Sequence, residues 1–379
     1  MRFLLSLYRY FSAGGLQMDS LRIARNACQR GHQVVFCTTR WEGPRPEDLP
    51  GLEIKLLPEP KAWTNLARLE QFGKMIAEER ARGHYDGEIA MNRFPGAEFY
   101  FAADECMKDL IYHQRRLGRL LLLFPRYRTL LRLEKETLFC PETKKILLLS
   151  QRQLQDFQRE YGLPTERFLM LPPGMDPGSL PPASQEEQQR LRQQERHSLG
   201  IQDDELLLLM VGTGLYRKGA DRYLAAVAAL PEDLRKRCRA AIIGRDSPDA
   251  IQSLARKAGL PHENLIVLPP RPSVGALYLA ADLLVHAARS EGSGTILVEA
   301  EANGLPVLCT AICGFSNFVE PTGMPVIPEP FRQEALNQAL KEVLPNLPEH
   351  AKRTCEYAAT QDFCRRTDAI VDLLEGKEC

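Results

Sequence analysis

The 379-residue sequence has no long hydrophobic run, no excess of either charge and no secretory signal. No stretch reaches the roughly 18 apolar residues that a membrane-spanning helix needs. Lys plus Arg and Asp plus Glu both number 49, so no net basic field favours nucleic acid. The apolar run Arg2–Tyr8 is short and leads into Gly14-Gly15 and a polar helix, unlike a signal peptide. We therefore expect a cytoplasmic protein that neither spans a membrane nor binds nucleic acid.

The ten cysteines are widely and irregularly spaced. In a cytosolic chain we expect their thiols to be reduced. Cys309 and Cys313 lie close together, but no second ligand pair follows at the spacing of a zinc site. The sequence therefore predicts no bound metal.

Short apolar segments alternate with amphipathic segments along both halves of the chain. In the first half we expect strands at Arg2–Tyr8, Gln33–Thr38, Gly87–Met91 and Lys145–Ser150, and helices at Leu16–Arg30, Asn65–Arg82 and Gln151–Tyr161. In the second half we expect strands at Leu206–Val211, Ala240–Gly244, Leu265–Leu268, Leu283–His286 and Pro306–Thr310. Strands that alternate with helices predict parallel, doubly wound α/β sheets.

A proline-rich stretch from Leu171 to Pro182, followed by the glutamine-rich run Gln185–Gln194, separates the two halves. This composition is typical of a linker that leads into a surface helix. The length also suits two α/β domains, each with its own core. We place the first domain at residues 1–170 and the second at 171–359, with a ligand held in the cleft between them.

Two strand-to-helix turns contain glycines and have the character of anion sites. Gly14 and Gly15 follow the first strand, where backbone N–H groups can approach an anion. Arg217 and Lys218 lie between glycines after Leu206–Val211, and this pair of cations suits a diphosphate and the charge of a departing phosphate. The alternatives are a plain turn for Gly14-Gly15 and two solvated surface cations for Arg217-Lys218.

Glu291 and Glu299 flank the start of a helix that we expect to end near Gly304. Gly292 and Gly294 leave N–H groups open at the helix start, which is again typical of an anion site. Glu299 is expected about two turns inside the helix, where a carboxylate needs a partner such as the hydroxyls of a ribose. Glu291 would then hold the hydroxyls of a sugar. A capping carboxylate plus a surface glutamate is an equally good interpretation of the residues alone.

Asp104 ends the apolar run Tyr100–Ala103 in the first half of the chain. A carboxylate there can position an acceptor hydroxyl or accept its proton. A buried structural aspartate is equally compatible with the pattern.

The stretch Cys106–Thr137 combines positive charge with leucines. It holds three acids and eight cations, which are Lys108, Arg115, Arg116, Arg119, Arg126, Arg128, Arg132 and Lys135. It also contains the apolar run Leu120–Phe124, followed by Pro125. This pattern is typical of a segment that lies on an anionic membrane, and the leucines favour lipid over nucleic acid. The alternative is a helix whose leucines belong to the core.

Taken together, the motifs resemble glycosyltransferase family 4, of the two-domain GT-B architecture, in the branch of lipopolysaccharide core glucosyltransferases. The resemblance covers nearly the whole chain and is carried by Tyr10-Phe11, Gly14-Gly15-Leu16-Gln17, Asp19, Tyr100 to Asp104, Leu171 to Gly174, Arg217-Lys218-Gly219, Glu291 to Glu299 and Gly304 to Leu308. It implies two Rossmann-like domains that face each other across a cleft. It also implies that a C-terminal helix in residues 360–379 crosses back to the first domain.

The resemblance implies a retaining enzyme that moves a hexose, glucose first, from a UDP-sugar to the inner-core heptose of lipopolysaccharide. Its partners would be the UDP-sugar, the lipid A–inner core acceptor and the anionic cytoplasmic face of the inner membrane, with no metal or other cofactor. UDP-galactose or a UDP-N-acetylhexosamine as donor, and another glycolipid or a capsule precursor as acceptor, are the alternatives. A sugar-nucleotide epimerase and a non-catalytic scaffold that binds sugar nucleotides are the more distant ones.

The resemblance also assigns roles to residues. The catalytic residues would be Asp104, Arg217, Lys218 and Glu291. The donor-binding residues would be Gly14, Gly15, Asp19, Arg217, Lys218, Arg271, Glu291, Gly294, Thr295, Ile296 and Glu299. Among these, Arg217 and Lys218 would bind the diphosphate. The ribose would be held by Glu299, the donor sugar by Glu291, and the base by the segment near Arg271.

Overall fold

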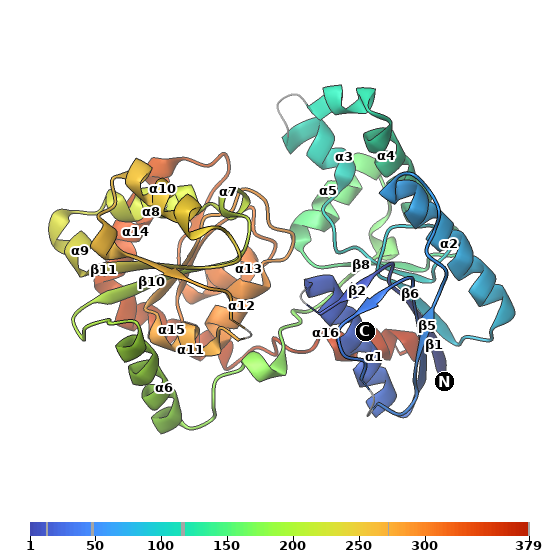
Figure 1. The fold of residues 1–379 in the computed structure, drawn as a ribbon, viewed down its shortest axis with the longest axis horizontal. Helices are drawn as coiled ribbons and strands as arrows, with labels where there is room; N and C mark the ends of the chain where they lie inside the picture. The colour runs from blue at the N-terminus through green and yellow to red at the C-terminus, as the bar shows by residue number, and fades with distance from the viewer. Residues whose placement is uncertain (13, 47–48, 115–117, 272, 378–379) are drawn as a thin grey trace. The chain divides into compact units, whose positions relative to one another are not determined.

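The computed structural model describes residues 1–12, 14–46, 49–114, 118–271 and 273–377 (Figure 1). The chain divides into two compact units, and each is described by itself. Unit 1 comprises Met1–Gly174 and Arg365–Cys379, and unit 2 comprises Met175–Cys364. Unit 2 is therefore inserted, in sequence, between the two parts of unit 1.

Unit 1 is built on a parallel sheet of seven strands. Across the sheet the strands are β5 (Leu52–Leu56), β3 (Gln33–Thr38), β1 (Arg2–Ser6), β6 (Gly87–Ala90), β7 (Phe99–Phe101), β8 (Lys145–Leu148) and β9 (Phe168–Met170). A separate parallel pair is formed by β2 (Tyr10–Phe11) and β4 (Trp41–Glu42). Because all strands of the main sheet run the same way, the loops after their carboxyl ends lie at one edge.

Helices cover both faces of this sheet. The α-helices are α1 (Gly15–Gln29), α2 (Asn65–Arg82), α3 (Met107–Asp109), α4 (Pro125–Leu138), α5 (Gln151–Tyr161) and α16 (Arg366–Leu374). A π-helical turn η1 (Leu110–Gln114) and the 3₁₀ segments η2 (Gly118–Leu123) and η3 (Thr165–Arg167) complete the unit.

The alternation of side chains along β1 explains why two separate cores form. Phe3 and Leu5 point to one face, where α1 and α16 cover them. Leu4 points to the opposite face and packs with Phe72 of α2 and with Phe94. A parallel strand that is covered on both faces needs apolar residues at successive positions, and Phe3, Leu4 and Leu5 of β1 provide them.

Unit 2 has a parallel sheet of six strands. Across the sheet the strands are β12 (Leu265–Leu268), β11 (Cys238–Ile243), β10 (Leu206–Val211), β13 (Leu283–His286), β14 (Val307–Thr310) and β15 (Val326–Ile327). The α-helices are α6 (Gln185–Ser198), α7 (Leu215–Lys218), α8 (Ala220–Ala228), α9 (Glu232–Arg237), α10 (Pro248–Ala258), α11 (Gly275–Ala280), α12 (Thr295–Ala302), α13 (Ser316–Val319), α14 (Gln333–Val343) and α15 (Leu347–Ala358). The 3₁₀ turns are η4 (Pro177–Ser179), η5 (His262–Asn264), η6 (Glu320–Thr322) and η7 (Leu344–Asn346).

The predicted α/β fold with two Rossmann-like parallel sheets is confirmed. Six strands were missed, and each has a local reason. In Leu52–Leu56 charged residues alternate with apolar ones, and β2, β4, β7, β9 and β15 are only two or three residues long. In the part of the chain that the structure describes, no helix combines the length and apolar character needed to span a bilayer.

Candidate functional site

A carboxylate, a lysine and a histidine meet at the carboxyl edge of the unit 2 sheet. Lys218 ends α7, in the turn after β10, and Glu291 lies in the loop after the neighbouring strand β13. The Lys218 ammonium forms an ion pair with Oε2 of Glu291. Nε2 of His286, the last residue of β13, lies 3.1 Å from the same oxygen. The structure therefore brings together two of the predicted catalytic residues, with an unpredicted histidine beside them.

Backbone contacts hold the two loops of this cluster against each other. Gly219 has a φ of +76°, and a β-carbon there would collide with the carbonyl oxygen of Ala287. The N–H of Arg289 donates to the carbonyl of Arg217 (2.8 Å), and the Arg289 guanidinium binds both carboxylate oxygens of Asp221 at 2.7 Å. Arg217 itself is exposed beside the cluster and donates to the carbonyl of Ser290 (3.3 Å).

Burial lowers the pKa of two members of the cluster. Burial and the neighbouring charge of Arg217 lower the pKa of Lys218 to about 8. Burial, together with Lys218 and Arg217, lowers the pKa of His286 to about 3, so the imidazole is neutral at neutral pH. At pH 7 the cluster thus holds two cations, one carboxylate and one neutral hydrogen-bond donor.

Glu299 lies near the start of helix α12. Gly294 precedes the helix in the left-handed conformation (φ +81°), and Thr295 and Ile296 are its first two residues. Their N–H groups have no intrahelical partner because the residues four positions earlier lie outside the helix. Glu299 is the fifth helical residue, so the expectation of about two turns is wrong, and the residue lies little more than one turn inside the helix. The hydroxyl of buried Tyr278 donates to its Oε2 at 2.9 Å.

Among the described residues, the structure shows no contact between Arg271 and Lys218, Glu291 or Glu299. It follows β12 at the sheet edge and forms an ion pair with Glu195 of α6 at 2.5 Å. Its proximity to a nucleotide base stays a prediction.

In unit 1, Gly14 and Gly15 lie at the amino end of α1, as the strand-to-helix turn predicts. Asp19, one turn further on, is largely buried and its carboxylate is engaged on both sides. Its Oδ2 lies 3.0 Å from Arg366, and its Oδ1 lies 3.3 Å from Arg22. Asp19 thus links α1 to α16 through Arg366, a structural role that the sequence did not predict. A contact between Asp19 and the donor stays a prediction.

Asp104 is exposed, so the alternative of a buried structural aspartate is wrong. It follows β7 at the carboxyl edge of the unit 1 sheet. The side-chain amide of buried Gln153 donates to the backbone carbonyls of Ala102 (2.9 Å) and Asp104 (3.1 Å). The backbone at Asp104 is therefore fixed while its carboxylate faces solvent.

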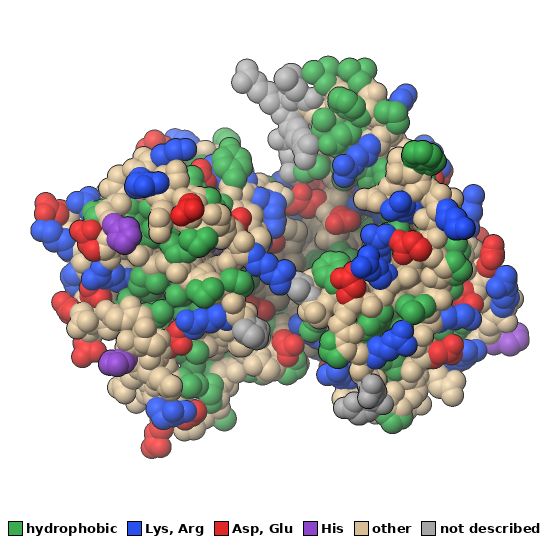
Figure 2. Space-filling view, viewed as in Figure 1, with side chains coloured by type: hydrophobic (Ala, Val, Ile, Leu, Met, Phe, Trp, Pro, Cys, Tyr) green, Lys and Arg blue, Asp and Glu red, His purple; other side chains and the backbone are tan. Residues whose placement is uncertain are grey.

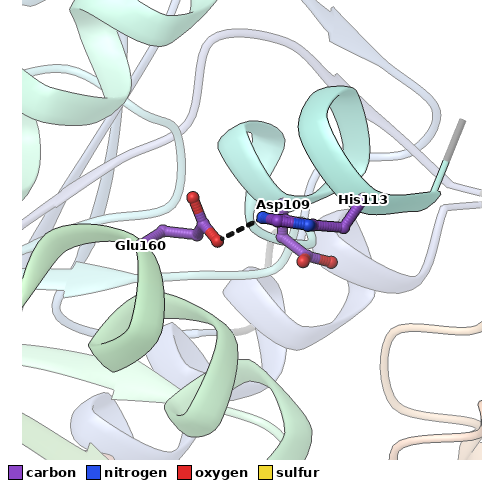
Figure 3. Close-up of side chains that lie close together, drawn as sticks. All are labelled: Asp109, His113 and Glu160. Atoms are coloured by element: carbon purple, nitrogen blue, oxygen red, sulfur yellow. Dashed lines mark ion pairs between the residues drawn. The ribbon is translucent and has the colours of Figure 1, made fainter. Parts of the chain in front are cut away.

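A second group of ionisable side chains lies elsewhere in unit 1. Figure 3 shows Asp109, His113 and Glu160, whose ligand atoms lie within 4.8 Å of one another. Nε2 of His113 lies 2.9 Å from Glu160, but Asp109 also pairs with Arg159, and the Lys108 ammonium lies 3.6 Å from Glu160. Because cations already neutralise both carboxylates, these residues form an ion-pair network and are poor ligands for a metal.

Comparison with known proteins identifies the family. Residues 192–361 match the model of glycosyl transferases group 1. The lipopolysaccharide glucosyltransferase WaaG of Escherichia coli K12 is 35% identical over 374 residues, which cover 98% of this chain and 97% of the relative. The chain belongs to the group 1 glycosyltransferase family.

Solved structures agree with this assignment. This glycosyltransferase matches the crystal structure of WaaG with a TM-score of 0.85 and 36% identity, over 99% of this chain and all of that one. Anabaena HepE in complex with UDP and glucose matches with a TM-score of 0.72 at 16% identity, over 99% and 100% of the two chains, which shows a shared fold. The predicted resemblance to the GT-B glycosyltransferases is confirmed.

Three residues of the candidate site were missed by sequence reasoning. His286 and Tyr278 contact Glu291 and Glu299 from neighbouring elements. Asp246, after β11, accepts hydrogen bonds from the N–H groups of Gly214 (2.7 Å) and Leu215 (3.4 Å) and so fixes the turn that leads to Lys218. Asp246 and His286 each come directly at or after a predicted strand end, which is a signal that sequence reasoning could have used.

Proposed function

We propose that this glycosyltransferase moves a hexose, glucose first, from a UDP-sugar to the inner-core heptose of lipopolysaccharide, with retention of anomeric configuration. Its identity to an Escherichia coli lipopolysaccharide glucosyltransferase extends over nearly the whole of both chains and supports the acceptor class. The relative solved with UDP and glucose shares the fold and supports the donor class.

The observation that carries the proposal is the contact between Lys218 and Glu291, with Arg217 beside it. Arg217 and Lys218 offer a guanidinium fork and an ammonium, the pair of groups that binds a diphosphate well. Glu291 offers carboxylate oxygens to sugar hydroxyls at the same place. Groups for the two halves of a nucleotide sugar are therefore neighbours, because Lys218 contacts Glu291 and Arg217 contacts the adjacent Ser290.

The proposed reaction is attack of an acceptor hydroxyl on the anomeric carbon from the face that the nucleotide leaves. The new bond joins the acceptor oxygen to that carbon, the bond to the diphosphate breaks, and the diphosphate takes the proton of the hydroxyl. Arg217 and Lys218 offset the charge that develops on the diphosphate, which is the largest catalytic effect that these residues can supply. Asp104 positions the acceptor hydroxyl. The proposal includes no metal and no other cofactor, because the two side chains supply the positive charge.

The same proposal places the enzyme on the cytoplasmic face of the inner membrane, held there by the segment Cys106–Thr137. At the junction of η2 and α4, Leu120, Leu123 and Phe124 are exposed by 55%, 75% and 60%, and Arg119, Arg126 and Arg128 are exposed around them. Figure 2 shows apolar side chains gathered at this end of unit 1. Arg115 and Arg116 lie outside the described residues. Exposed leucines among cations are typical of an interfacial segment, whereas Leu133 and Leu138 of α4 do belong to the core.

A transfer assay tests the proposed activity. The protein is supplied with UDP-glucose, UDP-galactose and UDP-N-acetylglucosamine and with heptose-terminated lipid A–core, and the product is followed by mass and anomeric NMR. We expect a hexose of retained configuration on the heptose. Lys218→Ala should lower kcat roughly 100-fold, whereas Lys341→Ala, an exposed lysine of α14, serves as the matched control. Nucleotide binding without transfer to any acceptor would contradict the proposal and favour a scaffold.

A vesicle assay tests the membrane part. Binding to vesicles with and without anionic lipid is compared for the wild type, for Leu120, Leu123 and Phe124 changed together to Ser, and for Arg119, Arg126 and Arg128 changed together to Gln. We expect both triple variants to lose binding to anionic vesicles. Equal binding of the wild type to neutral and anionic vesicles would overturn the electrostatic part.

A further inference from the structure

His286 is fully buried at the end of β13 and contacts Glu291 through one ring nitrogen only. Its Nε2 lies 3.1 Å from Oε2 of Glu291, the oxygen that also pairs with Lys218. An ionised carboxylate can only accept hydrogen bonds, so the ring proton must be on Nε2 and Nδ1 is left as an acceptor. The tautomer of His286 is therefore set by Glu291.

The other ring nitrogen of His286 adds no stabilising contact. Nδ1 is buried and has no hydrogen-bond partner among the residues that the structure describes. A buried polar atom without a partner is unfavourable, so this nitrogen does not stabilise the fold. An apolar side chain of similar size would fill the same space without this penalty.

The charge state of the ring also distinguishes it from its neighbours. Burial and the cations Lys218 and Arg217 keep the imidazole neutral, because they lower its pKa to about 3. The ring therefore adds a directed hydrogen bond to Glu291 without adding charge beside the two cations. A lysine or arginine at this place would fix the carboxylate too, but would repel Lys218.

We propose that His286 is a positioning residue that fixes the Glu291 carboxylate so that it binds the hexose of the nucleotide sugar. His286 and Lys218 both hold Oε2, which leaves Oε1 outside both contacts and available to sugar hydroxyls. When Lys218 turns to the diphosphate, His286 alone keeps the orientation of the carboxylate. The inference rests on the proposed function, and it assigns to His286 recognition of the sugar and not of the nucleotide.

The test compares His286→Leu, which cannot donate, with His286→Gln, whose side-chain amide can still donate to Glu291. Affinities for UDP and for UDP-glucose, together with kcat and KM, are measured for both variants and for the wild type. In His286→Leu we expect unchanged affinity for UDP, loss of any extra affinity for UDP-glucose, and a roughly tenfold or greater fall in kcat/KM, typical of a lost hydrogen bond to a charged group. His286→Gln should recover most of this loss, and the melting temperature of His286→Leu should not fall.

His350→Leu is the matched control, since His350 lies in α15 of unit 2 and its Nδ1 is likewise buried without a partner among the described residues. We expect this variant to behave as the wild type in every assay. Wild-type kcat/KM in His286→Leu, or equal loss of UDP and UDP-glucose affinity with no recovery in His286→Gln, would overturn the inference. Failure of the wild type to bind UDP-glucose would instead overturn the proposed function, so the two failures are distinguishable.

Discussion

The carboxylate of Asp19 and the guanidinium of Arg366 lie 3.0 Å apart in unit 1, although 347 positions separate them in the sequence. Arg366 is almost fully buried, and it also donates to the carbonyls of Pro172 (Nε, 3.2 Å) and Pro173 (N, 3.1 Å). Arg22 donates to the carbonyl of the next residue, Gly174, at 3.1 Å. The end of the first segment of unit 1 and the start of its last segment are thus joined at one buried ion pair.

Asp19→Asn should therefore lower the stability of the protein, whether or not it changes donor binding. It leaves the buried Arg366 charge without its carboxylate, and removal of one partner of a buried pair costs about 3–5 kcal/mol. Denaturant unfolding measures the loss, with Glu78→Gln as the control because Glu78 pairs with Arg82 on the exposed surface. Weaker UDP-sugar binding at unchanged stability would show instead that Asp19 contacts the donor.

Donor affinity should fall at alkaline pH because of Lys218. The pKa of this lysine is about 8 in the free protein, so the ammonium is charged below pH 8 and neutral above it. A bound diphosphate raises the pKa of a neighbouring lysine, because it stabilises the charged form. The affinity for UDP should therefore be highest below pH 8 and should fall roughly tenfold per pH unit above it. Calorimetry between pH 6.5 and 9.5 measures this change. Lys218→Arg keeps its charge and should show a flat profile, and a flat profile in the wild type would contradict the prediction.

Gly219→Ala should lower turnover, because it displaces the turn that carries Lys218 in addition to straining the backbone. The new β-carbon meets the carbonyl of Ala287, so the turn that carries Lys218 must move. Gly259→Ala is a matched control, because Gly259 has nearly the same φ (+75°) and nothing lies within 4 Å of a β-carbon there. Both variants should lose about 1 kcal/mol of stability through strain, and Gly219→Ala should lose more because of the collision, but only Gly219→Ala should also lose most of its turnover. Equal turnover in the two variants would contradict the assigned role of the turn.

Glu301 should destabilise the protein at neutral and alkaline pH. It is fully buried in α12, and neither of its carboxylate oxygens has a hydrogen-bond partner among the described residues. Burial raises its pKa from 4.5 to about 8, so the folded state binds the proton more tightly and stability declines as pH rises from about 4.5 to 8. Glu301→Met should raise the free energy of unfolding on the order of 2 kcal/mol at pH 7.5. Urea unfolding at pH 5 and pH 7.5 measures it, and a variant that is less stable at both pH values would show that Glu301 has an unseen partner.

Strong local patterns made much of the fold predictable. Asn65–Arg82 and Gln151–Tyr161 are helices with the predicted bounds, because capping by Thr64 and Ser150 and amphipathic spacing agree there. The strand Leu52–Leu56 was missed because its side chains are half-buried or exposed at the sheet edge, where Glu53 and Lys55 are tolerated. Edge position is a tertiary property that no local window contains.

The candidate site was predictable only as far as its local motifs reached. Glu291 and Lys218 were found because each follows a strand end in a glycine-containing turn. Their mutual contact depends on the parallel pairing of β10 with β13, which sequence alone did not specify. His286 was missed because a histidine at the end of an apolar strand has the pattern of a core residue.

Helix α16 has a consequence for the order in which the protein is made. Ile370, Val371 and Leu374 of this helix complete the core in which Phe3 and Leu5 lie. The ribosome must first add Met175–Cys364, which takes roughly 10–40 s at about 5–20 residues per second. Unit 2 is continuous in sequence, so it can fold during that interval. The early part of unit 1 still lacks α16 at that stage, and nascent unit 1 therefore exposes apolar surface until α16 has been synthesised.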